Sequence, residues 1–362
     1  MFANIHYPEK ISAKQLDAYL ANGWFRMGQS IFTTNFLRFN EQFYSAIWLR
    51  IALADFYLSK TQQKLKKLNA KFNVVVDRAS ITPEKEQLFA KYRASISFDA
   101  SPSLPYLLYN ESNRDIFDSY NVCVYEEEKL IAVGYFDLGQ TTSMGISCFY
   151  DPDYKKYSLG KYLMLLKIEY AIEQGLTYFY PGYFAPGYPL FDYKLDLAKA
   201  GLSFLDVVSN EWFDIAYFDG SQTPLVKMRQ ELKQLSTLMS NAGIDNSVWD
   251  YGYYDANLIP DLNGMGIFDF PVFLCCFDML DSLMNPLVIY DPRDNNFHLI
   301  LCRSLFRGDS SPNLERKIYI ANLLTIANII QQLIRQNTSL IFYFTQLNRV
   351  KKNKRVNREI IS

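Results

Sequence analysis

Residues 147–194 decide the fold of this 362-residue chain, and they read SCFYDPDYKKYSLGKYLMLLKIEYAIEQGLTYFYPGYFAPGYPLFDYK. They predict the end of a strand at 147–150, a polar turn, and a helix whose apolar residues recur with helical spacing. Gly175 stands where such a helix commonly ends, and the apolar run 176–180 predicts the next strand. A strand–helix–strand unit of this kind is expected to be right-handed, with its two strands parallel.

Two more strands are predicted just before this unit. The apolar runs 122–125 and 130–137 are joined by a polar turn, a pattern typical of an antiparallel hairpin. A helix is expected over 82–93, because Thr82 suits the N-cap and Pro83 suits the first helical position. Together these elements predict an α/β (α+β) fold with a mixed sheet and flanking helices.

The pattern of elements changes after residue 209. A helix is predicted over 225–241, and a hairpin joins 287–290 to 297–301 through a polar turn. An apolar helix is expected from about 314 to 335. These elements predict a C-terminal α/β module that ends in a basic tail.

A chain of this length is long enough for two or three domains. We therefore expect an N-terminal region at 1–70, a central domain at 71–209 that carries the functional site, and the C-terminal module at 210–362. The sequence leaves the role of that module open, because the basic tail is typical both of RNA contacts and of a solvated, disordered end.

Charge and composition exclude several classes of function. The 37 lysine and arginine residues balance the 38 aspartate and glutamate residues, so only local patches could attract nucleic acid. The only histidines, His6 and His298, are too few for a histidine-rich metal site or for a triad, so we expect no metal. The glycine-rich loops typical of nucleotide hydrolases and of dinucleotide-binding proteins do not occur.

The compartment is predicted from the cysteines and from the N-terminus. The five cysteines lack C-x-x-C spacing, which favours a reducing compartment. The N-terminal MFANIHYPEK lacks the pattern of a signal peptide. The most apolar region, 268–290, is interrupted by aspartates and a proline, so we expect no membrane span and no membrane partner. We therefore expect a cytoplasmic protein.

Two parts of the central stretch suggest a binding site. The helix start at Tyr157–Lys161, YSLGK, suits either a bound phosphate or an ordinary helix with Ser158 at its N-cap. The loop between Gly182–Tyr183 and Tyr193–Lys194 lies at the carboxyl edge of the predicted sheet, where ligands tend to bind. Its tyrosines and lysine either line a site or fold back on the sheet.

Four short motifs follow one another in this region: Asp151–Tyr154 (DPDY), Ser158–Gly160 (SLG), Gly182–Tyr183 (GY) and Tyr193–Lys194 (YK). This series resembles the arginyl- and leucyl-tRNA–protein transferases of the N-degron pathway, whose catalytic half is similar to the GNAT acyltransferase fold. The upstream segments GWFRMG and TQQKLKKLN are similar to further elements of that family, so the resemblance covers roughly residues 16–196.

The chain also departs from the family pattern. Residues 33–39, TTNFLRF, stand where the family has an N-terminal cysteine cluster. Tyr188, Leu190 and Phe191 hold the positions of the family's C/S-x-K-M element, and residues 195–197 replace its F-x-P-x-E element. These changes leave the acceptor open.

The resemblance suggests roles for the conserved motifs of the family. Lys194 would pair with an acidic N-terminal residue of the acceptor, and Tyr183 and Tyr193 would donate to the oxyanion or orient the ester. Asp151 or Asp153 would hold an amine or a guanidinium group. Ser158–Gly160 would cradle the terminal nucleotide, and nearby lysines would meet tRNA phosphates. The predicted catalytic residues are Tyr183, Tyr193, Lys194 and Asp153, and the predicted substrate- or tRNA-binding residues are Arg26, Asp151, Tyr154, Lys155, Lys156, Ser158, Leu159, Gly160, Lys161 and Gly182.

The function implied by the resemblance is that of an aminoacyl-tRNA–protein transferase. Such an enzyme moves an amino acid, arginine or a leucine-like one, from charged tRNA to the N-terminal α-amine of a protein or peptide. The ester is already reactive, so positioning supplies most of the acceleration and we expect no cofactor besides the charged tRNA. Two alternatives stay open: a GNAT-type acyltransferase that uses acyl-CoA or another acyl donor on a small molecule, and a non-catalytic relative.

Overall fold

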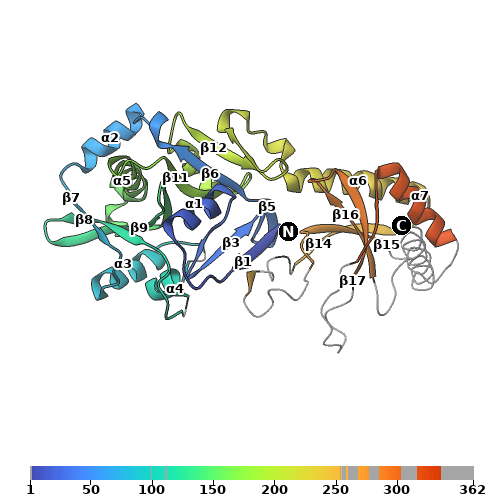
Figure 1. The fold of residues 1–362 in the computed structure, drawn as a ribbon, viewed down its shortest axis with the longest axis horizontal. Helices are drawn as coiled ribbons and strands as arrows, with labels where there is room; N and C mark the ends of the chain where they lie inside the picture. The colour runs from blue at the N-terminus through green and yellow to red at the C-terminus, as the bar shows by residue number, and fades with distance from the viewer. Residues whose placement is uncertain are drawn as a thin grey trace, which may run out of the picture. The chain divides into compact units, whose positions relative to one another are not determined.

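The computed structural model of this chain divides into two compact units, residues 1–220 and 221–362 (Figure 1). The structure describes residues 2–98, 100–110, 112–252, 254, 258–259, 268–276, 285–302 and 316–335. The basic tail predicted at the C-terminus lies outside these residues. The domain boundaries expected after residues 70 and 209 remain predictions.

The first unit is built on an eight-stranded sheet. Its strands stand in the order β13 (Glu211–Asp214), β12 (Leu202–Asp206), β6 (Ile47–Ala52), β11 (Tyr178–Phe184), β10 (Thr142–Tyr150), β9 (Lys129–Leu138), β8 (Ser119–Glu126) and β7 (Asn73–Arg78). Neighbouring strands run antiparallel except β10 and β11, which are parallel. The predicted mixed sheet with one parallel connection is therefore confirmed.

Helices cover both faces of this sheet. They are α2 (Lys60–Asn69), α3 (Pro83–Arg93), α4 (Leu104–Tyr109) and α5 (Leu159–Glu173). Successive side chains of a strand point to opposite faces, so Val122 and Val124 of β8 share a core cluster with Leu163 of α5, whereas Cys123 shares one with Leu88 of α3. Helix α2 lies on the α5 side and α4 on the α3 side (Figure 1).

The rest of the first unit consists of short elements. They are β1 (Ala3–His6), α1 (Ala13–Ala21), β2 (Phe25–Met27), β3 (Ser30–Thr34), β4 (Phe36–Phe39), β5 (Gln42–Ser45) and the 3-10 segments η1 (Leu53–Asp55), η2 (Pro152–Tyr157), η3 (Pro189–Asp196) and η4 (Ile215–Tyr217). Strands β4 and β5 form a separate hairpin. The expected cap of α3 is present, because the Thr82 hydroxyl accepts a hydrogen bond from the Lys85 backbone N–H at 3.2 Å.

The described residues of the second unit form an antiparallel sheet and the helices α6 and α7. The chain order is η5 (Gly220–Gln222), α6 (Pro224–Asn241), β14 (Asn246–Asp250), β15 (Val272–Cys276), β16 (Asn285–Asp291), β17 (Asn296–Cys302), β18 (Arg316–Ala321) and α7 (Leu323–Arg335). The predicted hairpin is confirmed as β16–β17. Within the described part of the chain, no helix, α6 and α7 included, has the length and apolarity that a membrane span requires.

The helix expected from about residue 314 was wrong at its start. Residues 316–321, RKIYIA, form strand β18, which pairs with β17, and helix α7 begins only at Leu323. A short run with isoleucine and tyrosine suits a strand as well as a helix, and pairing with β17 decides between them.

Candidate active site

The two parallel strands β10 and β11 stop pairing with each other after a short distance. Thr142–Met144 of β10 pairs with Tyr178–Tyr180 of β11, and both strands then continue without pairing with each other. A bulge between Gly145 and Ser147 shifts the register of β10 against β9 just beyond this point. Because ligands bind at the carboxyl ends of parallel strands, the residues around these ends form the candidate active site.

Lys194 lies beside β11, in η3, with 8% of its surface exposed. Its Nζ donates a hydrogen bond to the backbone oxygen of Tyr183 at 2.6 Å. The nitrogen also lies 5.1 Å from the centre of the Tyr183 ring and 4.9 Å from the centre of the Phe191 ring. Burial lowers the pKa of Lys194 to about 7, with Cys148 acting weakly in the opposite direction. An amine with this pKa can accept a proton near neutral pH.

Gly182 provides the space that Lys194 occupies. Its φ is +89°, in the left-handed region that favours glycine, and a Cβ at this position would lie 3.3 Å from Nζ of Lys194. The GY and YK motifs, which are separate in the sequence, therefore meet in one place. The loop between the two motifs was expected either to line a site or to fold back on the sheet. Lys194 borders the strand ends, as a site residue would, whereas Tyr188 and Phe191 pack onto other aromatic rings.

Tyr183 and Tyr193, the two predicted catalytic tyrosines, are half-buried. Burial raises the pKa of Tyr183 to about 12. Burial also raises the pKa of Tyr193, with smaller contributions from Cys148 and Tyr92. Both phenols therefore keep their protons at neutral pH and can serve as hydrogen-bond donors.

The DPDY turn uses its carboxylates within the protein. Asp151 is buried and forms ion pairs with Lys91 at 2.5 Å and with Lys129 at 3.0 Å. Burial would raise the pKa of Asp151, but these two hydrogen bonds and one from the Asp153 backbone N–H outweigh it and lower the pKa to about 2. Asp153 is exposed and pairs with Lys91 at 2.6 Å. Asp151 thus acts as a structural anchor of the turn, and its expected contact with a substrate remains a prediction.

The first turn of α5 lacks the ordinary serine cap. Ser158 has a φ of +49° and a ψ of 45°, and its side chain makes no capping hydrogen bond. Leu159 is fully buried in the core, backbone included. Gly160 is half-buried, with Tyr150 near its α-carbon. Of the two interpretations of this helix start, the one with Ser158 as a side-chain N-cap is therefore wrong.

The cations near this helix start differ in their surroundings. Lys155, Lys156 and Lys161 are exposed. Tyr154, by contrast, is half-buried, its hydroxyl donates to Glu126, and Lys129 lies over its ring at 4.8 Å. The lysines can reach a ligand from solvent, whereas Tyr154 mainly holds the turn in place.

Arg26 is part of the core, and its expected contact with a substrate or tRNA remains a prediction. It is buried, and its Nη1 donates to both oxygens of Asp137, at 2.8 and 3.1 Å. Nη2 donates to the Leu108 backbone oxygen at 2.5 Å and Nε to the Gly28 backbone oxygen at 2.7 Å. These bonds and its burial hold the Arg26 guanidinium group in the core.

Lys167 is the residue near the site that the sequence interpretation missed. It is fully buried in α5, and its Nζ donates to the Ser147 backbone oxygen at 2.7 Å and lies 3.2 Å from Cys148 Sγ. Gly134 of β9 leaves room for it, since a Cβ there would lie 2.6 Å from Cε of Lys167. Burial lowers the pKa of Lys167. A lysine inside the apolar run LMLLKIEY was the available signal.

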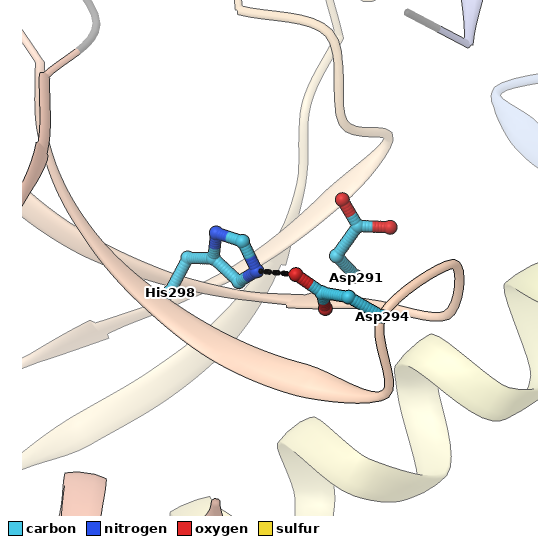
Figure 2. A group of neighbouring side chains, drawn as sticks. All are labelled: Asp291, Asp294 and His298. Atoms are coloured by element: carbon cyan, nitrogen blue, oxygen red, sulfur yellow. Dashed lines mark hydrogen bonds and ion pairs between the residues drawn. The ribbon is translucent and has the colours of Figure 1, made fainter. Parts of the chain in front are cut away.

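One group of side chains in the second unit has the composition of a metal site. Asp291, Asp294 and His298 offer ligand atoms within 4.8 Å of one another (Figure 2). His298 Nε2 lies 2.9 Å from Asp294 Oδ2, while both oxygens of Asp291 bind Arg293, at 2.8 and 2.7 Å. The cation Arg293 thus already pairs with Asp291, so the arrangement is explained by this ion pair and by the His298–Asp294 hydrogen bond at the β16–β17 turn.

Residues 84–202, which contain most of the candidate active site, match the family described as "Arginine-tRNA-protein transferase, C terminus". An aspartate/glutamate leucyltransferase of Leptospira interrogans serogroup Icterohaemorrhagiae is 29% identical over 217 residues, which cover 57% of this chain and 79% of that protein. One from Campylobacter jejuni subsp. jejuni serotype O:23/36 is 27% identical over 197 residues, covering 52% and 80%. The predicted resemblance is therefore confirmed.

Among solved structures, the chain is similar to a GCN5-related N-acetyltransferase from Kribbella flavida. The identity is 18%, the TM-score is 0.24, and the match covers 41% of this chain and 61% of that one.

Proposed function

Because residues 84–202 match the arginine-tRNA–protein transferase C-terminus family, we propose that this protein is an aminoacyl-tRNA–protein transferase. It moves an amino acid from the 3′ end of a charged tRNA to the N-terminal α-amine of a protein or peptide. The buried amine of Lys194 carries the proposal, because it borders the open ends of β10 and β11 and has the proton affinity of a general base near neutral pH.

Lys194 accepts the proton that the acceptor amine loses. In the transfer, the α-amine nitrogen bonds to the ester carbonyl carbon, and the bond from that carbon to the ribose oxygen of the tRNA breaks. With a pKa of about 7, roughly half of the Lys194 amines are neutral at pH 7 and can take the proton. Lys194 then returns the proton to the departing ribose oxygen. This role replaces the pairing with an acidic residue that the family motif suggested, since the amine is only partly charged at neutral pH.

Tyr183 and Tyr193 supply the hydrogen-bond donors of the site. The carbonyl oxygen of the ester gains negative charge as the amine attacks, and donors placed there in advance lower the barrier. Both hydroxyls keep their protons at neutral pH. Tyr193 is the better candidate, because it packs, together with Cys148 of β10, against the core cluster that contains Phe179 and Phe184 of β11.

Exposed lysines on α2, η2 and α5 form the tRNA contact surface. Asn69 Nδ2 at the end of α2 donates to the Tyr157 backbone oxygen at 3.1 Å, which holds α2 against the start of α5. In the first turn of α5, which has no side-chain cap, the half-buried Gly160 would present its backbone N–H to a phosphate of the terminal nucleotide. The lysines of this surface are Lys60, Lys64, Lys67, Lys155, Lys156 and Lys161.

The donor also suggests the location and the first substrates to test. Charged tRNA serves translation, so we place the protein in the cytoplasm. Two relatives are named aspartate/glutamate leucyltransferases, and the matching family is named for arginine. Leucine and arginine are therefore the donor amino acids of choice, and peptides that begin with aspartate or glutamate are the first acceptors. The charged tRNA is itself the activated co-substrate, so the reaction requires no other cofactor.

Transfer of a labelled amino acid tests the proposal. Purified protein is incubated with tRNA charged with labelled leucine or arginine and with peptides that begin with aspartate, glutamate or alanine. We expect label in at least one peptide, and none when the α-amine of that peptide is acetylated. If a complete pool of charged tRNAs transfers no label to any acceptor, the proposal fails.

A further inference from the structure

Four half-buried aromatic side chains cover the region of Lys194. Phe39 at the end of β4 stacks on Tyr188, with ring centres 4.4 Å apart and 12° between the planes. Tyr44 of β5 lies 5.4 Å from Tyr188. Phe191 lies 5.8 Å from Phe39 and 5.7 Å from Tyr188. We refer to Phe39, Tyr44, Tyr188 and Phe191 as the aromatic cover.

The aromatic cover reaches Lys194 through Phe191. The Phe191 ring lies 4.9 Å from Nζ and makes an edge contact with Tyr183 at 5.3 Å, so two rings stand around the amine. An ammonium group has three hydrogen-bond donors. Lys194 donates one hydrogen bond, to the Tyr183 backbone oxygen. No carboxylate pairs with it among the described residues. The titratable groups around it are Cys148 of β10, Tyr183 of β11, and Tyr188 and Tyr193 in or beside η3.

We propose that the aromatic cover is a positioning device for Lys194, in which Phe39 and Tyr188 hold Phe191 over Nζ and exclude water from it. The inference rests on the proposed function for its catalytic meaning, although its physical part concerns Lys194 alone. Water stabilises the charged ammonium form of Lys194 more than it stabilises the neutral amine. Excluding water therefore favours the neutral form. The hairpin β4–β5 thereby acts on a lysine about 150 residues away in the sequence.

Tyr188 and Phe191 are two of the positions at which this chain differs from the family motif. The Phe39 ring from the separate hairpin β4–β5 stacks on Tyr188 and also lies near Phe191. The inferred cover therefore includes two aromatic residues at positions where this chain differs from the family motif.

Competitive acetylation of Lys194 tests the inference without any activity measurement. The full chain, without tRNA, is treated with a trace of acetic anhydride over a range of pH, and the Lys194 peptide is quantified by mass spectrometry. In the unmodified sequence we expect half-maximal reactivity near pH 7. In Phe39→Ala and Phe191→Ala we expect that midpoint to rise by about one unit or more, because water reaches Nζ.

Two further variants separate this effect from a general loss of packing. Phe191→Met keeps an apolar side chain over Nζ and should retain the low midpoint. Phe213→Ala removes a ring that packs on Phe204 at the β12–β13 edge and should also leave the midpoint unchanged. If Phe39→Ala and Phe191→Ala, both checked for folding by circular dichroism, keep the midpoint of the unmodified sequence, the inference is wrong.

Activity measurements then connect the aromatic cover with the reaction. Where transfer is observed, the acid limb of the rate of Phe39→Ala should move to higher pH in parallel with the acetylation midpoint, and the maximal rate at high pH should recover. A loss of rate that is equal at all pH values would contradict a positioning role. A shifted midpoint in a protein that transfers no amino acid would keep the aromatic cover and reject the proposed function.

Discussion

The DPDY turn and Lys194 lie at the two ends of residues 151–194, and their buried ionisable groups have opposite surroundings. Asp151 is buried between Lys91 and Lys129, and these partners lower its pKa to about 2. Lys194 is buried between aromatic rings, and burial lowers its pKa to about 7. The first arrangement fixes a charge in place, whereas the second leaves an amine that can change its charge. The comparison teaches that a buried charge with counter-ions is fixed, whereas a buried amine without a counter-ion has its charge set by access to water.

The largest effect is expected from Lys194→Met. Methionine keeps the unbranched apolar stem but cannot accept a proton, so the rate of transfer should fall by about 10²-fold or more. The thermal unfolding midpoint should stay equal or rise, because no amine has to be buried. Initial rates at saturating charged tRNA and a thermal melt measure both quantities. A variant that transfers at nearly the original rate would remove Lys194 from the reaction.

Asp151→Asn, unlike Lys194→Met, should lower the stability of the fold more than the rate of transfer. The unfolded carboxyl group has an ordinary pKa of 3.8 and the folded one a pKa of about 2, so the charged form stabilises the fold above pH 4 by roughly 2 kcal/mol. This contribution is lost as the pH falls toward 2. Urea unfolding at pH 7 and at low pH should therefore show a difference between variant and original that shrinks with acid. An unchanged midpoint at pH 7 contradicts the anchoring role.

The pH dependence of the reaction should follow Lys194 and not Asp151. Below its pKa of about 7, Lys194 is protonated and cannot accept a proton, so the rate should fall by about tenfold for each pH unit below that value. The rate profile of Asp151→Asn should keep the same acid limb, which makes it the matched control. An acid limb near pH 4 instead would indicate that a carboxylate, and not Lys194, accepts the proton.

A smaller effect, on tRNA binding, is expected from exposed lysines that contact neither Asp151 nor Lys194. Lys60, Lys64 and Lys67 recur on one face of α2 and are exposed. Changing all three to glutamine should weaken tRNA binding and reduce the salt dependence of the binding constant by about two logarithmic units of slope. The matched control, Lys10→Gln with Lys14→Gln, removes exposed charges elsewhere. Equal salt slopes in both variants would place the tRNA contact on another surface.

The smallest effect is expected from Asp153→Asn. Asp153 is exposed and shares Lys91 with Asp151, and exposed ion pairs contribute only about 0 to 1 kcal/mol. Urea unfolding should therefore separate it clearly from Asp151→Asn. A loss of rate without loss of stability would instead support the predicted contact of Asp153 with the attacking amine or with a guanidinium group.

Local sequence patterns predicted the elements that carry the site. The helix after the DPDY turn, the parallel strand after it and the cap at Thr82 are encoded within a few residues, since spacing and capping act locally. The sequence could not predict which charges meet. Arg26 pairs with Asp137, and Asp151 pairs with Lys91, because the fold brings residues that are far apart in the sequence together. For the same reason the strand at 316–321 was taken for a helix, because its partner β17 decides its state.

Lys167 gives the protein an unusual relation between folding and protons. Its amine is fully buried in the first unit and donates a hydrogen bond to the Ser147 backbone oxygen. Burial lowers the pKa of Lys167 from its ordinary value of 10.5, and it also lowers the pKa of Lys194. The unfolded chain therefore binds protons that the folded chain gives up, between about pH 7 for Lys194 and 10.5. Through these two lysines, folding releases protons, and a moderately alkaline solution favours the native state.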